Sequence, residues 1–196
     1  MIQENETFSG EESLQLISSM INRAKNRFSE TGTLYLLWGW VIFICCATQF
    51  ILQYFFKSPY AYYIWFLSWA ALIYQVIFLA KKKKNAKVRT YTGEILGYVW
   101  LTFTVCIFIT VFILEKQKAY PSINAVILVL YGVPTFLSGK ILKFPALATG
   151  GICCWLLAIV TPFVPLEFQQ LLLAAAVVVA WIIPGYLLRS KFKKEN

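Results

Sequence analysis

The chain contains no histidine and no aspartate, and all nine of its acidic residues are glutamates. General acid–base and nucleophilic catalysis depends on such side chains held beside a reacting group. Three glutamates, Glu94, Glu115 and Glu167, fall only at the edges of apolar runs, where solvation explains them. We therefore expect no enzyme, no cofactor and no metal site.

Charge is scarce as well, since charged residues make up 14% of the 196 residues against about a quarter in a soluble domain. Hydrophobic residues make up 59%, and the mean hydropathy is +0.66. The net charge of +9 does not indicate a nucleic-acid partner, because the cations border apolar runs instead of forming a basic polar face. The lipid bilayer is the expected partner.

Long uncharged runs decide the fold class. Each is long enough to cross the hydrocarbon core, which takes about 20 helical residues. Short polar connections between them favour antiparallel neighbours. The sequence therefore predicts an all-α, polytopic membrane protein, an up-down bundle of six transmembrane helices. The predicted spans are residues 34–55, 60–80, 95–114, 120–139, 145–164 and 168–188.

The placement of lysine and arginine predicts the orientation. Cytoplasmic loops of membrane proteins collect these residues. With both termini on the cytoplasmic side, 15 of the 18 cations lie there. We therefore expect both termini of 31–188, the transmembrane domain, to face the cytoplasm, together with the basic tail at 189–196.

The densest cationic segment lies between the second and third spans. Its main role is expected to be a topology anchor, and it can also contact anionic lipid headgroups or a partner protein. The residues concerned are Lys81, Lys82, Lys83, Lys84, Lys87 and Arg89.

Aromatic residues gather near the ends of two spans, where Trp and Tyr favour the membrane interface. The outer group is predicted at the start of the second span and the inner group at the start of the third. Trp69 and Trp155 lie mid-span and are expected to fill space between helices. The interface groups are Tyr60, Tyr62, Tyr63 and Trp65, and Tyr91, Tyr98 and Trp100.

Residues 1–30 form a separate cytoplasmic arm with a predicted amphipathic helix at about 10–29. Ser9 and Glu12 fit a capping box, and apolar residues follow at steps of three and four. This stripe can lie on the inner membrane surface, pack under the bundle, or pair with a second copy. Its members are Leu14, Ile17, Ile21, Ala24 and Phe28.

Polar and helix-breaking residues inside the spans are the candidates for a solute path. Gln75 and Thr104 are uncharged polar residues within spans, and Pro134 lies near the centre of the fourth. Proline frees a backbone carbonyl, and freed carbonyls coordinate substrates in some transporters. Hydrogen bonds between helices and a simple kink are the alternative interpretation.

Small residues and cysteines have structural explanations. Ala146 and Gly150 are spaced for close helix approach. The five cysteines lack the ligand spacing of a zinc site and are expected to be small packing residues. A thiolate cluster joining Cys45 and Cys153 is the alternative.

Four stretches together carry a resemblance. "EESLQLISSMINRAKN" (11–26), "LLWGW" (36–40), "KVRTYTGE" (87–94) and "YVW" (98–100) resemble small bacterial six-span inner-membrane proteins that have no assigned activity. The resemblance implies a bacterial inner-membrane location. Such proteins are often encoded beside small winged-helix regulators, which implies a regulatory setting.

These features favour a non-enzymatic membrane protein with a regulatory or scaffolding role. It would act through helix–helix contacts, the arm and the lysine segment, with a homo-oligomer or another membrane protein as partner. The alternative is a small transporter or channel for an uncharged or apolar solute. A polar cavity reaching mid-membrane would favour transport, and a dry, filled interior would favour a scaffold.

Overall fold

The computed structural model describes residues 10–11, 14–20, 32–85 and 91–195. These residues are almost entirely helical, and none of them forms a strand. Within them, six helices are long and apolar enough to cross a membrane, which confirms the all-α, six-span fold class. The crossings are Gly32–Tyr54, Ala61–Lys81, Thr92–Lys116, Tyr120–Ile141, Pro145–Phe163 and Leu166–Ser190.

The crossings are built from α-helices and three short segments of other helical type. The first five crossings correspond to α2, η1 with α3, α4, α5, and α6 with η2. The sixth is one continuous helix made of α7, the π-helical segment η3, and α8. The bounds are α2 (Gly32–Tyr54), η1 (Ala61–Trp65), α3 (Phe66–Asn85), α4 (Tyr91–Lys116), α5 (Tyr120–Ile141), α6 (Pro145–Val160), η2 (Thr161–Phe163), α7 (Leu166–Val177), η3 (Val178–Ile182) and α8 (Ile183–Glu195).

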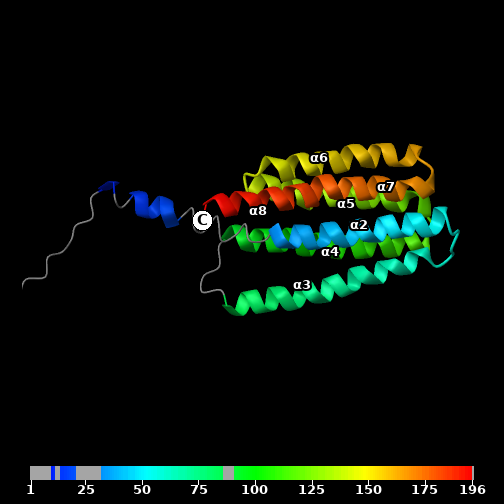
Figure 1. Ribbon diagram of the computed structural model, residues 1–196, viewed down its shortest axis with the longest axis horizontal. Coiled ribbons are helices and arrows are strands. Elements are labelled where there is room, and N and C mark those ends of the chain that lie inside the picture. The colour runs from blue at the N-terminus through cyan, green and yellow to red at the C-terminus, as the bar shows by residue number, and fades with distance from the viewer. Residues whose placement is uncertain (1–9, 12–13, 21–31, 86–90, 196) are drawn as a thin grey trace, which may run out of the picture.

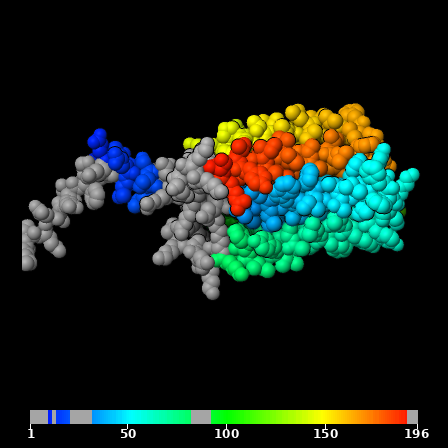
Figure 2. Space-filling model, viewed as in Figure 1, coloured from blue at the N-terminus to red at the C-terminus, as the bar shows by residue number. Residues whose placement is uncertain are grey.

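Successive crossings run antiparallel, as Figure 1 shows. The start of α2, the end of α3 and the end of α8 therefore lie at one end of the bundle, which we call the terminal end. On the face seen in Figures 1 and 2, α2 lies between α8 and α3. The first crossing thus packs against the last one, since α2 contacts α7, η3 and α8.

Short turns with lysine in a left-handed conformation join several crossings. The φ angles are 45° at Lys57, 55° at Lys118 and 51° at Lys143. After α5, the Phe144 N–H donates to the Gly139 carbonyl over 2.8 Å, which closes the helix end in the way a Schellman motif does. Glycine is the usual residue at such a position, so each of these lysines adopts a conformation that is costly for a residue with a Cβ.

Glycines let the crossings approach closely. A Cβ on Gly139 of α5 would lie 2.8 Å from the Cα of Ala148 in α6. A Cβ on Gly150 of α6 would lie 2.7 Å from the Cα of Ala180 in η3. The expectation that Gly150 supports close helix approach is therefore confirmed.

Burial is uneven among the crossings. In the most apolar 18-residue stretch of the last crossing, 56% of the residues are buried within the protein. The corresponding share is only 6% in each of the second and third crossings. The core therefore lies among α2, α5, α6 and the α7–η3–α8 helix. The α3 and α4 helices sit at its edge.

Neither central proline ends its helix. Pro134 is fully buried, and α5 continues through it to Ile141, so no helix break occurs there. Pro184 lies just after η3 and inside the same continuous crossing. Because proline has no N–H, it removes one hydrogen bond from the turn before it. The widened π turn of η3 occupies that position.

Part of the predicted arm helix is described. Residues 10–11 and 14–20 are helical, while 21–29 lie outside the described residues. Leu14, Leu16, Ile17 and Met20 are all exposed. The described part of the stripe is therefore not covered by the bundle.

Candidate functional site

The lysine segment continues a membrane-spanning helix. Lys81 to Lys84 extend α3 beyond its apolar part, and α3 ends at Asn85. Lys81 is exposed, and Lys87 and Arg89 lie outside the described residues. This helix end belongs to the terminal end of the bundle, where α8 also ends (Figure 1).

Of the three residues proposed to line a solute path, two form hydrogen bonds within the protein and the third is buried. Gln75 accepts a hydrogen bond from the indole of Trp38 in α2. The Thr104 hydroxyl donates to the Trp100 carbonyl over 2.8 Å within α4. Pro134 is buried in the contact region of α5. The structure does not bring these three side chains together in either of the two grooves described below.

A buried aromatic and polar cluster joins α5 to the last crossing within the core. The Trp181 indole donates to the Thr135 hydroxyl over 2.9 Å, and that hydroxyl donates to the Tyr131 carbonyl over 2.7 Å. The rings of Tyr131 and Trp181 lie 4.6 Å apart. These bonds satisfy the polar atoms of side chains that are nearly inaccessible to solvent or lipid.

Trp100 packs against this cluster, so its ring faces the core and not the outer surface of the bundle. Its ring packs edge-on against Tyr35 at 5.5 Å and lies 6.0 Å from Trp181. Tyr98, two residues earlier, is exposed as expected of an interface residue. A helical rotation of about 200° between the two positions explains why neighbours in one motif face opposite sides.

A second polar cluster lies at the opposite end of the bundle. Asn124 of α5 donates to the side-chain oxygen of Gln169 in α7 over 3.3 Å. The Gln169 amide donates in turn to the carbonyls of Val164 and Thr161, at 3.1 and 3.3 Å. These hydrogen bonds hold the turn between α6 and α7 against α5, which indicates a structural role for this cluster.

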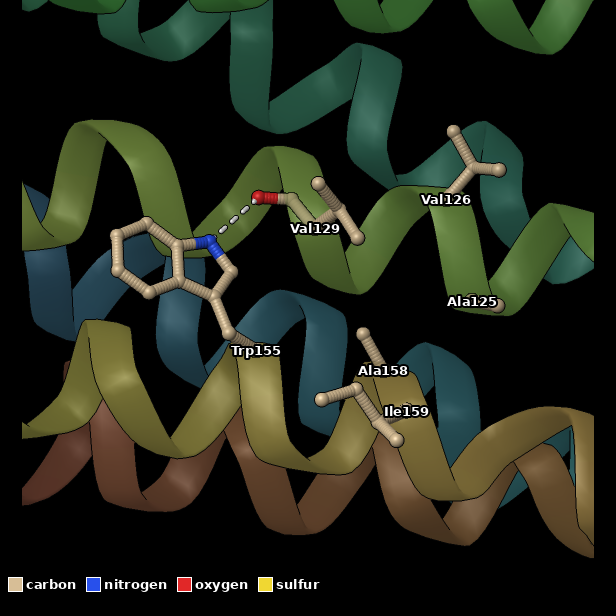
Figure 3. Close-up of a pocket in the computed structure, with 6 residues that line it drawn as sticks. All are labelled: Ala125, Val126, Val129, Trp155, Ala158 and Ile159. Atoms are coloured by element: carbon tan, nitrogen blue, oxygen red, sulfur yellow. Dashed lines mark hydrogen bonds between the residues drawn. The ribbon is translucent and has the colours of Figure 1, made fainter.

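The first groove, of about 390 Å³, lies between α5 and α6 (Figure 3). The Trp155 indole reaches across it and donates to the Val129 carbonyl over 3.2 Å. Trp155 thus fills space between two helices, as its mid-span position predicts. The groove is entirely apolar in its lining, which consists of Ala125, Val126, Val129, Trp155, Ala158 and Ile159.

The second groove, of about 380 Å³, lies over α2 and between α3 and α8. An apolar stripe of α2 from Thr33 to Ile44 forms its floor. Tyr74 of α3 and Tyr186 of α8 stand on its two sides. Arg189 of α8 lies at one end, and it is the only charged residue among those lining the groove.

This groove is the part of the molecule that inspection of the sequence missed. Its floor follows helical spacing on α2 (33, 37, 40, 44), and Tyr186 and Arg189 share one face of α8 at a spacing of three. That signal is present in the sequence. The pattern does not indicate a groove by itself, because only the structure shows that the first crossing lies beside the last.

Three of the five cysteines are buried packing residues, whereas Cys106 is exposed, so the expectation of a packing role is wrong for Cys106. Cys45, Cys46 and Cys154 are buried and free, and Cys153 is partly exposed. The Cys45 thiol lies 3.6 Å from the Ile64 carbonyl, which it faces as a weak donor. No three His, Cys, Asp or Glu side chains gather in the described residues to hold a metal ion.

Comparison with protein-family models, with curated proteins and with solved structures finds no match to this chain.

Proposed function

We propose that this integral membrane protein is a non-enzymatic scaffold or regulator that binds another membrane protein. Its α3 and α4 helices supply the contact surface inside the bilayer. The N-terminal arm and the lysine end of α3 supply the contact on the cytoplasmic side.

The low burial of α3 and α4 carries this proposal. In the most apolar 18-residue stretch of each crossing, only 6% of the residues are buried. In lipid, helices associate through the packing of their surfaces and through interhelical hydrogen bonds, since lipid tails are as apolar as leucine. Two helices with few buried residues leave more of their surface open for such packing than the other crossings do. Trp69 and Phe108, whose rings lie 5.1 Å apart, connect them.

The use of polar side chains also supports a scaffold over a solute path. Gln75 is bonded to Trp38, and the Trp65 indole donates to Gln49 over 2.5 Å. Thr135 is bonded on both sides within the core. A path for a polar solute requires polar side chains that face open space. Here these side chains form their hydrogen bonds within the protein.

The proposed location is the bacterial inner membrane with both termini in the cytoplasm. The excess of cations at the terminal end supports this orientation through the positive-inside rule. The resemblance to small bacterial six-span proteins supports the location. The exposed apolar stripe of residues 14–20 is then available to a cytoplasmic partner or to the membrane surface.

Site-specific photocrosslinking tests the helix surface. A photoreactive amino acid at Ile73 of α3 or Phe112 of α4 is expected to give a discrete protein adduct in cells. The matched control is Ile159 of α6, which is exposed to a similar degree but lies on a well-buried helix. Lipid-only products at all three positions would reject the proposal.

Deletion of residues 1–30 tests the arm. The deleted protein is expected to recover fewer cytoplasmic partners in a pull-down while keeping the membrane adducts of α3 and α4. An unchanged partner set would remove the arm from the proposal. Saturable uptake of an uncharged solute by vesicles containing the pure protein would instead establish the transporter alternative.

A further inference from the structure

We propose that the groove over α2 binds one anionic phospholipid, with an acyl chain along the groove and its phosphate at Arg189. The ligand class is a glycerophospholipid with net negative charge, held in the leaflet at the terminal end of the bundle. This proposal does not depend on the protein partner proposed above.

The length of the groove matches one lipid leaflet. Its floor on α2 extends from Thr33 to Ile44, which is about 16 Å at the rise of an α-helix. Half of the hydrocarbon core is about 15 Å thick. An acyl chain lying in the groove would therefore reach from the headgroup level to the middle of the membrane.

The groove has the chemistry of a chain-binding surface along its length. Leu37, Val41 and Ile44 line the floor, and Tyr74 and Phe78 line the α3 side. The rings of Tyr74 and Phe78 are stacked at 6.2 Å. Apolar and aromatic walls with few polar groups are the usual lining of a small-molecule site.

On the α8 side, one hydrogen bond between two aromatic side chains holds the wall of the groove in place. The Trp40 indole donates to the Tyr186 hydroxyl over 3.3 Å. This bond joins α2 to α8 and holds both rings at the groove. It also satisfies the indole N–H, which would otherwise face hydrocarbon.

Positive charge gathers at one end of the groove. Arg189 lines that end itself, level with Gly32, because a Cβ on Gly32 would lie 3.4 Å from the Cβ of Leu188. Lys81 lies six residues beyond Gln75, and Thr33 lies five residues before its partner Trp38. At about 1.5 Å per residue, Lys81 therefore lies toward the same end of the bundle as Thr33, although it does not line the groove.

Arg189 therefore stands at the mouth of the groove on the α8 side. Arginine binds phosphate through a planar pair of donors. Basic pockets between transmembrane helices on the cytoplasmic side are typical sites for anionic headgroups. The α5–α6 groove has no such charge in its lining, so the same argument does not apply to it.

Native mass spectrometry of the full chain from nanodiscs provides the test. The probes are phosphatidylglycerol and phosphatidylcholine with identical acyl chains. The wild-type protein is expected to retain one phosphatidylglycerol in preference to phosphatidylcholine. Arg189→Gln is expected to lower that retention about tenfold, since it removes a charge-assisted pair. Lys143→Gln, a cation at the same end but outside the groove, is the matched control and is expected to have no effect.

Filling the groove tests the chain site separately. Val41→Trp is expected to lower retention of phosphatidylglycerol, and Val129→Trp in the α5–α6 groove is its matched control. Equal retention of both lipids, or equal effects of Arg189→Gln and Lys143→Gln, would overturn the proposal. A dimer that Val41→Trp abolishes would also overturn it, because a second copy would then fill the groove.

Discussion

At the scale of single residues, glycine position decides how tightly two crossings meet. Gly139 and Gly151 stand where α5 and α6 are in closest contact, and each lacks room for a Cβ. Gly97 on α4 faces open space, with no described atom within 4 Å of an added Cβ. Glycine is therefore required for close helix packing at positions 139 and 151, whereas at position 97 a side chain would meet no neighbour.

This contrast predicts opposite changes in stability. Gly139→Ala forces a Cβ against the backbone of Ala148 and is expected to cost about 1–3 kcal/mol of unfolding free energy. Gly97→Ala replaces an exposed helical glycine and is expected to add about 0.5–1 kcal/mol. Reversible unfolding in mixed micelles measures both. A Gly139→Ala protein as stable as the wild type would contradict the close contact of α5 and α6.

At the scale of helices, the turns matter as much as the apolar runs. Lys57, Lys118 and Lys143 each follow a crossing and adopt a positive φ. Cations at the end of a helix also interact favourably with its dipole. Each lysine therefore combines a favourable charge with an unfavourable backbone conformation.

The conformational part can be measured at Lys143. Lys143→Gly relieves the left-handed strain and is expected to raise the unfolding free energy by up to about 1 kcal/mol. Lys143→Ala removes the same charge and keeps the strain, so it should bring no gain. A thermal melt of both variants in one detergent separates the two effects, and equal stability of the two variants would contradict a strain effect.

The helix containing Pro184 shows a second way to accommodate a local conflict. The crossing does not stop at the proline, and the five-residue π segment η3 precedes it. Trp181 lies inside that segment and donates to Thr135. The wider turn thus places the largest buried ring of the cluster against α5.

At the scale of the whole molecule, the even number of crossings puts the start of the first crossing and the end of the last crossing on the same side of the membrane. A reporter fused at Ala86 is expected to show cytoplasmic activity, because 15 of 18 cations lie on that side. A reporter at Ser58, in the turn between α2 and η1, is the control and should show external activity. The reverse pattern would contradict the proposed orientation.

The sequence was sufficient for the number of crossings and the antiparallel order, because charge and length determine both. It was insufficient for the faces that the helices turn inward. The ring of Trp100 faces the core, which its place in an aromatic motif does not indicate, and Pro134 lies in an unbroken helix instead of at a break. In lipid the inside and outside of a bundle are equally apolar, so hydrophobic periodicity carries little information about orientation.

The candidate groove shows the same limit more sharply. Its floor and its arginine come from opposite ends of the chain, and no local pattern joins Thr33 to Arg189. Only the contact between the first and last crossings brings them together.

That contact also constrains how the protein is made. The main neighbours of α2 are the helices after Pro165, so most of its packing surface has no partner until the chain beyond Pro165 has been synthesised. Contacts between distant parts of a chain form late and leave intermediates exposed. During translation the first crossing must therefore be sheltered by lipid or by the insertion machinery. In a nascent chain on a ribosome stalled before residue 165, α2 would lack its main packing partners, α7, η3 and α8.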